Sequence, residues 1–249
     1  MAGSNMIDQY IEHIVSEEGL KKNTTSSYRY DLEGFQAYLK GISVTAPAQI
    51  KRAHIVSYLL YLRRIGRATT TILRCAASIK GYCKYLVKNG LISENPCEGL
   101  KLPKNEQKTV KAPTSVDVIS LMDQISQHSV KGIRDRAMID LVARTGMRAS
   151  EMTALNLSDY MADKALISLK TEKGELFFPL SPETKSMLDR YLKDSRPTMC
   201  RNAETALFVN MAGQRITRQG FWKIVRQYHQ RTGSTIPITP RTLRYTLLG

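Results

Sequence analysis

The chain has 249 residues, of which 42% are hydrophobic, and its 37 Lys and Arg outnumber its 22 Asp and Glu to give a net charge of +15. This composition is typical of a globular protein with one large or two smaller domains, and the lack of a long apolar run argues against a membrane span or a secretory signal. The basic excess favours a polyanionic partner, most commonly nucleic acid, over a membrane surface.

The cysteines and histidines favour a cytoplasmic protein without a metal centre. The four cysteines, Cys75, Cys83, Cys97 and Cys200, show no paired metal-ligand spacing, and the four histidines are scattered along the chain. Reduced thiols in the cytosol are the simplest account of this cysteine usage. An aromatic content of 7%, with dispersed tyrosines, also disfavours a stacking platform for single-stranded nucleic acid.

Residues 1–92 show the apolar periodicity of helices. Apolar side chains recur at spacings of three and four over 5–18, after the basic junction 21–25, over about 50–64 and over 68–90. Short loops join these segments, which is typical of antiparallel neighbours. We therefore predict a four-helix bundle as the N-terminal domain.

Basic and hydroxyl residues gather where these helices are predicted to start. Helix N-termini favour phosphate because their N–H groups are free and their dipole is positive. A solvated charge explains any one of these residues, but their clustering favours phosphate contacts. The candidates are Lys21, Lys22, Thr25, Arg67, Thr70 and Arg74.

Residues 93–113 change character, because prolines and lysines replace the apolar periodicity. We predict an interdomain linker here, and its basic residues could follow a nucleic-acid backbone. Residues 114–249 then form a second domain of mixed α and β structure. Its predicted elements are a helix from 115, strands at 166–169, 176–180 and 206–210, helices at 183–192 and 216–231, and a last helix from Pro240.

An apolar helical run, 137–142, leads to Thr145 and Gly146, and a new helical stretch holds Ser150 and Glu151. Glycine accepts the left-handed conformation that a helix C-cap often needs, so Gly146 is expected to end the first helix. Arg148 then lies on a rigid corner between two helices. A guanidinium there is either a surface charge or a ligand for a phosphate, which it can bind with two parallel hydrogen bonds.

Other basic residues of the second domain could join Arg148. Lys170 and Lys173 flank the predicted hairpin tip, where a lysine is usually solvated. Arg241 and Arg244 are three residues apart on the last helix. Two guanidiniums and an ammonium group that meet at one phosphate make a site for phosphoryl transfer, in which the arginines neutralise the oxygens and the lysine protonates the leaving oxygen. The basic helix at 216–231 adds further DNA-contact candidates, namely Arg215, Arg218 and Trp222.

At this point the sequence resembles the tyrosine recombinase (phage integrase) family, and its Xer branch in particular. In the second domain the resemblance lies in four ordered stretches: Arg134–Met138 with Thr145–Glu151, Lys170-Thr171 before Phe177–Leu180, Thr217–Trp222, and Ile238–Arg244. In the first domain it lies in the spacing of Tyr28, Asp31, Leu32, Phe35 and Leu39, and of Arg74, Ser78, Lys80 and Tyr85. The match extends over essentially the whole chain.

The resemblance implies a mainly α fold with a small β-hairpin: a SAM-like four-helix core-binding domain and a mixed α/β catalytic domain. It also implies a partner, double-stranded DNA, and a DNA-bound tetramer with further copies or another recombinase. A tyrosine of the family attacks the scissile phosphate to give a 3′-phosphotyrosine, with no metal or nucleotide cofactor. By position, Arg148 and Arg244 would bind the phosphate, Lys170 would be the general acid with Lys173 as its rival, and Glu151 would support Arg148. Lys80 would join the DNA contacts.

Two departures from the family pattern put cleavage in doubt. Arg241 stands where the family has histidine, and a guanidinium cannot shuttle a proton near neutral pH. The sequence ends at Gly249, before the place of the nucleophilic tyrosine, and Tyr245 lies about a quarter-turn from Arg244 on a helix. The end could reflect a cut chain, a degenerate gene product or a helix supplied by another chain. The alternative function is a catalytically inactive DNA-binding relative that occupies a recombination site or modulates an active recombinase.

Overall fold

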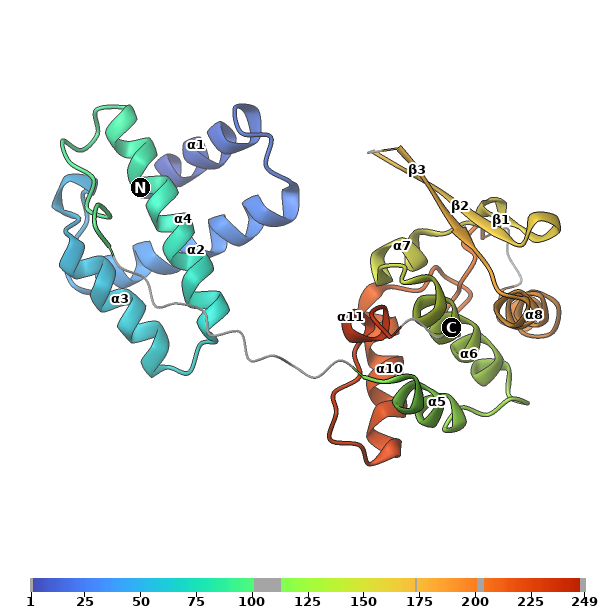
Figure 1. Cartoon of the computed structure of the whole chain (residues 1–249). Helices are drawn as coiled ribbons and strands as arrows, with labels where there is room; N and C mark the ends of the chain where they lie inside the picture. Colours follow the sequence, from blue (N-terminus) through green and yellow to red (C-terminus); the bar gives the residue numbers. More distant parts are fainter. Residues whose placement is uncertain (1, 101–112, 173, 201–203, 247–249) are drawn as a thin grey trace. The chain divides into compact units, whose positions relative to one another are not determined.

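The chain is described by a computed structural model, and it divides into two compact units, Met1–Lys108 and Thr109–Gly249 (Figure 1). Each unit has its own buried apolar core. Most of the linker predicted at 93–113 lies outside the described residues. The structure describes residues 2–100, 113–172, 174–200 and 204–246.

The first unit is the predicted four-helix bundle. Its helices are α1 (Ala2–Ser16), α2 (Lys22–Gly41), α3 (Arg52–Arg64) and α4 (Thr69–Lys88), with a 3-10 turn, η1 (Pro47–Gln49), before α3. The apolar positions three and four apart fall on one side of each helix and meet in one core. The side chains at its centre are almost fully buried, and they include Ile14, Leu32, Phe35, Ile55, Ile79 and Leu86.

The second unit is built around one buried helix. α6 (Val130–Thr145) is buried along most of its length and contacts helices on several sides (Figure 1). A helix that is buried on most faces needs such neighbours, because its apolar side chains must be kept from water and its buried charged side chains need partners. The surrounding helices are α5 (Ser115–Asp123), α7 (Ala149–Ala154), α8 (Pro182–Arg190), α9 (Arg196–Met199), α10 (Arg218–Thr232) and α11 (Pro240–Leu243).

A small antiparallel sheet lies beside these helices. Its strands, in spatial order, are β1 (Tyr160–Met161), β2 (Leu166–Thr171) and β3 (Gly174–Pro179), and two 3-10 turns flank β1, η2 (Leu157–Asp159) and η3 (Ala162–Lys164). The register pairs Ile167 with Phe178 and Leu169 with Leu176. Ile167, Leu169 and Phe178 pack on the core, whereas Leu176 is exposed. The two predicted hairpin strands are confirmed, and the short β1 was not predicted.

The strand predicted at 206–210 is wrong, because this stretch makes only isolated bridges, which pair Ala206 with Asn156 and Val209 with Arg215. Its backbone groups are satisfied by other partners. The amide of Leu207 donates to the carbonyl of Leu155, and the carbonyl of Ala206 accepts from the Arg196 guanidinium. A local pattern of apolar residues cannot distinguish such a buried segment from a strand.

The helix predicted at 183–192 ends at Arg190 and continues as one wide π turn, Tyr191–Ser195, before α9. The π turn adds a residue to the helical repeat, and both Tyr191 and Ser195 are fully buried in it. The Tyr191 ring stacks on Phe208, and its hydroxyl accepts a hydrogen bond from the amide of Val209. The turn thereby ties this helix to the segment that was predicted as a strand.

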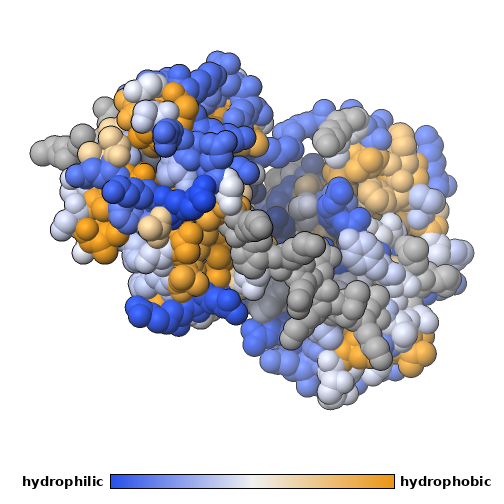
Figure 2. Space-filling model, turned by 60° about the vertical axis from the view of Figure 1, so that its left-hand side comes forward, coloured by the Kyte–Doolittle hydropathy of each residue, from blue (hydrophilic) through white to orange (hydrophobic). Residues whose placement is uncertain are grey.

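The outer surface mixes hydrophilic and hydrophobic residues. Figure 2 shows hydrophilic residues over much of both units, interrupted by smaller hydrophobic groups. Among the exposed apolar side chains are Leu60 and Ile65 in the first unit and Val116 and Phe177 in the second. No described helix combines the length and the apolar character that crossing a bilayer requires.

Candidate phosphate-binding pocket

The corner between α6 and α7 positions Arg148. Gly146 caps α6 with a φ of 66°, a conformation that costs a residue with a Cβ atom about 1–2 kcal/mol. The next residue, Met147, is fully buried and anchors the corner in the core. Arg148 then serves as the N-cap of α7, and its side chain is 63% exposed.

Glu151 holds Arg148 at two points. Its carboxylate accepts one hydrogen bond from the backbone amide of Arg148 at 2.6 Å and another from Nη1 of the same residue at 2.7 Å. The Glu151 side chain is only 14% exposed, so the pair is partly shielded from water. A charge-assisted bond to a capping carboxylate is strong and directional, and it sets the direction of the guanidinium while leaving its other N–H groups available.

The first turns of α10 form a second wall. The Thr217 hydroxyl caps this helix by accepting from the amide of Gly220, and Phe221 and Val225 turn into the core. The positions on the opposite side face outward. They are Arg218, Gln219, Trp222 and Lys223, and the Trp222 ring lies 5.2 Å from the Arg226 guanidinium carbon.

The short helix α11 supplies the third wall. Thr239 and Thr242 cap it by exchanging hydrogen bonds of 2.9 and 3.1 Å, and Leu243 anchors it in the core. Arg241 is exposed. Arg244, at the end of the helix, places its guanidinium over the Tyr245 ring at 5.3 Å, and its buried Nε–H has no partner among the described residues.

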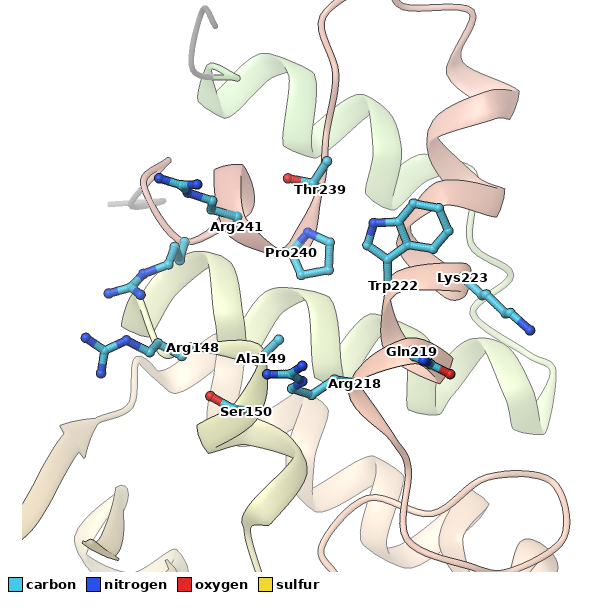
Figure 3. A pocket seen from close by; sticks show the side chains of 11 residues that line it. Arg148, Ala149, Ser150, Arg218, Gln219, Trp222, Lys223, Thr239, Pro240 and Arg241 are labelled. Atoms are coloured by element: carbon cyan, nitrogen blue, oxygen red, sulfur yellow. The ribbon is translucent and has the colours of Figure 1, made fainter. Parts of the chain in front are cut away.

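These three elements enclose a pocket of about 750 Å³. In Figure 3, Arg148 and Arg241 extend on the same side, whereas Arg218 lies beside Ser150, across the small surface of Ala149 and Pro240. Five cationic residues line the pocket, and none of the described lining residues is acidic. The complete lining is Arg148, Ala149, Ser150, Arg218, Gln219, Trp222, Lys223, Thr239, Pro240, Arg241 and Arg244.

The pocket is chemically suited to phosphate. Guanidiniums bind phosphate oxygens with paired N–H donors and remain charged at any working pH. The donors of Arg148 are already oriented by Glu151, so this guanidinium needs little rearrangement to bind an anion. Such a pocket can bind a phosphodiester and stabilise the charge that builds on its oxygens during phosphoryl transfer.

A buried polar network joins α6 to α10. Nε and Nη2 of Arg134 donate to one oxygen of Asp135 at 2.9 and 2.7 Å, and the Tyr228 hydroxyl donates to the other at 2.9 Å. Burial raises the pKa of the Asp135 carboxyl, and it outweighs the attraction of Arg134 and the bond from Tyr228. Because buried polar groups need fixed partners, this network sets the position of α10 against α6.

The predicted residues fall into different places. The structure brings together Arg148, Arg218, Trp222, Arg241 and Arg244, as the previous paragraphs describe. Lys170 is exposed on β2, paired across the hairpin with Glu175, and it does not line the pocket. Its rival Lys173 lies outside the described residues.

Arg215 differs from its predicted role. Its Nη1 donates to the carbonyls of Thr153 and Leu155 at 3.1 and 2.9 Å, and its Nη2 donates to the side chain of Asn156. The guanidinium thus binds the loop after α7. This internal set of partners accounts for the charge, so we assign Arg215 a structural role in place of a DNA contact.

In the first unit, Thr25 also departs from the prediction. It is 6% exposed, and its hydroxyl donates to the carbonyl of Lys22 in the same helix, so it cannot reach a phosphate. Position 25 lies one turn into α2, where the helix has already rotated this side chain toward the core. The other candidates are exposed, namely Lys21, Lys22, Arg67, Thr70, Arg74 and Lys80.

Sequence reasoning missed Gln219 and Lys223, which line the pocket. The sequence did indicate that both side chains point outward, since both lie opposite the apolar helix face formed by Phe221, Ile224 and Val225. It was not used because solvated charge is the usual state of a basic helix face.

Two family descriptions match the chain. "Phage integrase family" matches residues 114–248, and "Phage integrase, N-terminal SAM-like domain" matches residues 7–90. Tyrosine recombinase XerD of Listeria innocua is 31% identical over 248 residues, which cover 98% of this chain and 83% of the relative. Tyrosine recombinase XerC of Herpetosiphon aurantiacus is 34% identical over 243 residues, which cover 96% and 79%.

Solved structures of integrases share the fold. A lambda integrase dimer bound to a COC′ core site superposes with a TM-score of 0.78 at 14% identity, over 98% of this chain and 84% of the other. A lambda integrase tetramer bound to a Holliday junction superposes with a TM-score of 0.79 at 15% identity, over 98% of this chain and 68% of the other. The Tn1549 transposon integrase in complex with circular intermediate DNA superposes with a TM-score of 0.73 at 19% identity, over 97% of this chain and 85% of the other.

Proposed function

The chain belongs to the phage integrase family of tyrosine recombinases, and on this basis we propose that it binds double-stranded DNA and holds a scissile phosphate in the pocket between α7, α10 and α11. The observation that carries this proposal is the convergence of Arg148, Arg241 and Arg244 on one pocket without an acidic lining residue among those described. A duplex presents a dense row of phosphates, and cationic pockets attract it strongly.

Each basic residue has a distinct part in the proposed reaction. Arg148 and Arg244 bind the non-bridging oxygens and neutralise the charge that grows on them as a tyrosine hydroxyl attacks phosphorus and releases its proton to water. The new bond joins the tyrosine oxygen to phosphorus, and the bond from phosphorus to the 5′ oxygen breaks. Lys170 is the proposed general acid that gives a proton to this leaving oxygen. Because Lys170 does not line the pocket, this role requires its side chain to be brought to the phosphate when DNA binds.

Arg241 is proposed as a third phosphate ligand. The related family position holds histidine, whereas a guanidinium only donates hydrogen bonds and cannot accept the proton of the attacking hydroxyl. This difference supports the second candidate, an inactive relative that occupies a recombination site. In both cases we propose a cytoplasmic DNA-binding protein that assembles with further recombinase protomers, up to a tetramer.

A nicked suicide duplex tests the proposal. The chain is incubated with the duplex and examined for a covalent protein–DNA adduct, while binding is measured in parallel over a range of salt concentrations. Salt-dependent binding with an adduct supports an active recombinase, and salt-dependent binding without an adduct supports the inactive relative. A failure to bind duplex DNA contradicts both.

Variants connect the binding to the pocket. Arg148→Ala and Arg244→Ala should each weaken duplex binding and lower the slope of log K against log salt by about 0.9, the value for one phosphate contact. Lys164→Ala is the matched control, because it removes an exposed charge that does not line the pocket. Equal effects of all three variants would mean that net charge alone drives binding.

A further inference from the structure

The pair formed by Asp31 and Arg74 in the first unit differs from an ordinary surface ion pair. Nε of Arg74 donates to Oδ2 of Asp31 at 2.9 Å, and Nη2 donates to Oδ1 at 2.9 Å. The Asp31 side chain is 4% exposed, whereas the Arg74 side chain is 42% exposed. The buried carboxylate of Asp31 on α2 therefore fixes the orientation of the Arg74 guanidinium, which extends from α4 toward solvent.

This geometry leaves a defined set of donors. A guanidinium has five N–H groups, and Asp31 accepts from two of them along the side edge. The remaining three are two on Nη1 and one on Nη2, and the structure gives them no partner among the described residues. At the end of the side chain, one N–H of Nη1 and one N–H of Nη2 point in parallel. These two N–H groups form an edge that can donate two hydrogen bonds to one partner.

The surface around Arg74 suits the major groove of a duplex. Arg67, Thr71 and Arg74 line one hollow of about 690 Å³ between α2, α3 and α4. Further along α4 the exposed positions are Ala77, Lys80 and Lys84. α4 carries no acidic residue, so Lys80 and Lys84 can meet phosphates beside a groove, and the small Ala77 allows bases to approach. The exposed Glu33 of α2 also lines the hollow, on the side of Asp31.

We propose that Arg74 reads a guanine in the major groove through this end edge, and that Asp31 is the positioning residue that fixes its plane. Guanine presents two acceptors there, O6 and N7, and their spacing matches two parallel N–H donors of arginine. The proposal rests on duplex binding as the function of the chain. It makes Arg74 a determinant of sequence preference, whereas a phosphate contact would bind all sequences alike.

The first experiment measures sequence preference with the full chain. A duplex library with randomised sequence is selected by the wild-type chain and by Arg74→Lys, Arg74→Ala, Asp31→Asn and Lys80→Ala. The wild-type chain and Lys80→Ala should enrich the same guanine, and Arg74→Ala should lose it. Arg74→Lys has no two-donor edge but keeps one ammonium donor, so it should enrich this guanine less strongly. Arg74→Lys keeps the charge and Asp31 can still pair with it, so this variant also serves as the control for folding.

The second experiment replaces atoms of the base. In the duplex enriched by the wild-type chain, each guanine is changed in turn to 7-deazaguanine, which pairs normally but lacks N7. At one position the change should weaken wild-type binding by about 2- to 12-fold, half the free energy of a bidentate pair, and leave Arg74→Ala binding unchanged. Asp31→Asn should show a smaller effect at the same position, because one carboxylate oxygen is lost and the plane can rotate.

Other outcomes overturn the proposal. If Arg74→Ala enriches the same sequences as the wild-type chain, or if no 7-deazaguanine position distinguishes the two, Arg74 does not read guanine. If Arg74→Ala instead weakens binding to all duplexes equally and lowers the salt slope by about 0.9, it contacts a phosphate. Both results leave the proposed function intact, whereas a chain that binds no duplex contradicts the proposed function and the guanine contact together.

Discussion

Single side chains in this protein take their roles from their partners. Arg148 is 63% exposed, yet Glu151 fixes it at two points, and Arg74 is fixed in the same manner by the buried Asp31. Arg215 has the same charge, but its guanidinium donates hydrogen bonds to the carbonyl oxygens of Thr153 and Leu155. The difference between a ligand for an anion and a structural cation therefore lies in the donors that remain available.

Glu151→Gln should lower the free energy of unfolding of the second unit by about 1–2 kcal/mol, because the variant loses a charged N-cap partner and its attraction to the N-terminus of α7. Urea denaturation measures this change. Glu17→Gln, at an exposed position after α1, is the control and should have little effect. A change in Glu151→Gln no larger than that of the control would show that the charge of Glu151 does not stabilise the second unit.

Arg241→His should make duplex binding depend on pH. Histidine loses its charge around pH 6.5, so the affinity of the variant should fall as pH rises from about 5.5 to 8, while the wild-type affinity stays level. At pH 8 the salt slope of the variant should be smaller by about 0.9. Binding titrations at several pH values measure both, with the exposed Arg190→His as control. A level profile in Arg241→His would remove Arg241 from the phosphate site.

At the scale of elements, the pocket depends on how helices end. α6 ends at Gly146 and α7 begins after Arg148, so the position of the guanidinium is decided by the three-residue corner. α10 is set against α6 by the buried network of Arg134, Asp135 and Tyr228. A pocket built on helix ends that are anchored in a core can hold its donors in place before the ligand arrives.

Gly146→Ala should destabilise the second unit by about 1–2 kcal/mol, because alanine is strained at a φ of 66°. It should also weaken duplex binding, since the corner that directs Arg148 must shift. Gly41→Ala, at the last residue of α2 with open space around it and no positive φ, should be neutral or stabilising. The unfolding free energy and the affinity for duplex DNA are measured for both variants. If Gly146→Ala is as stable as Gly41→Ala, the conformation of Gly146 does not matter for stability.

At the scale of the whole molecule, the chain has two separate cores. Each is large enough to unfold as a cooperative unit. The proposed DNA contacts lie in both units, with Arg74 in the first and the phosphate pocket in the second. Binding to one duplex would then link two bodies that are independently stable.

We expect two unfolding transitions in calorimetry of the free chain. Phe35→Ala should lower the unfolding free energy of the first unit only, and Phe208→Ala that of the second unit only, each by about 3–5 kcal/mol. Each ring is almost fully buried in a different core. The exposed Phe177→Ala is the control for a ring outside both cores. A single transition that both core variants shift equally would mean that the units fold as one.

Local patterns were sufficient for much of this protein. The four helices of the first unit, the hairpin and the stop at Gly146 follow from apolar periodicity and from glycine's freedom at a positive φ, and these depend only on neighbours along the chain. The net charge is a sum over residues, so it pointed to a polyanionic partner before any fold was known. The ordered arginine motifs pointed to the family that the comparisons then identified.

The tertiary structure decided which of the basic residues are available. The acceptors of Arg215 lie 62 and 60 residues earlier in the chain, and the carboxylate that holds Arg74 lies 43 residues earlier. Burial of Thr25 and the missing strand at 206–210 likewise depend on partners brought in by the fold. Hydrogen bonds and burial act over distances of a few ångströms in space, and the sequence determines such proximity only through the packing of the whole unit.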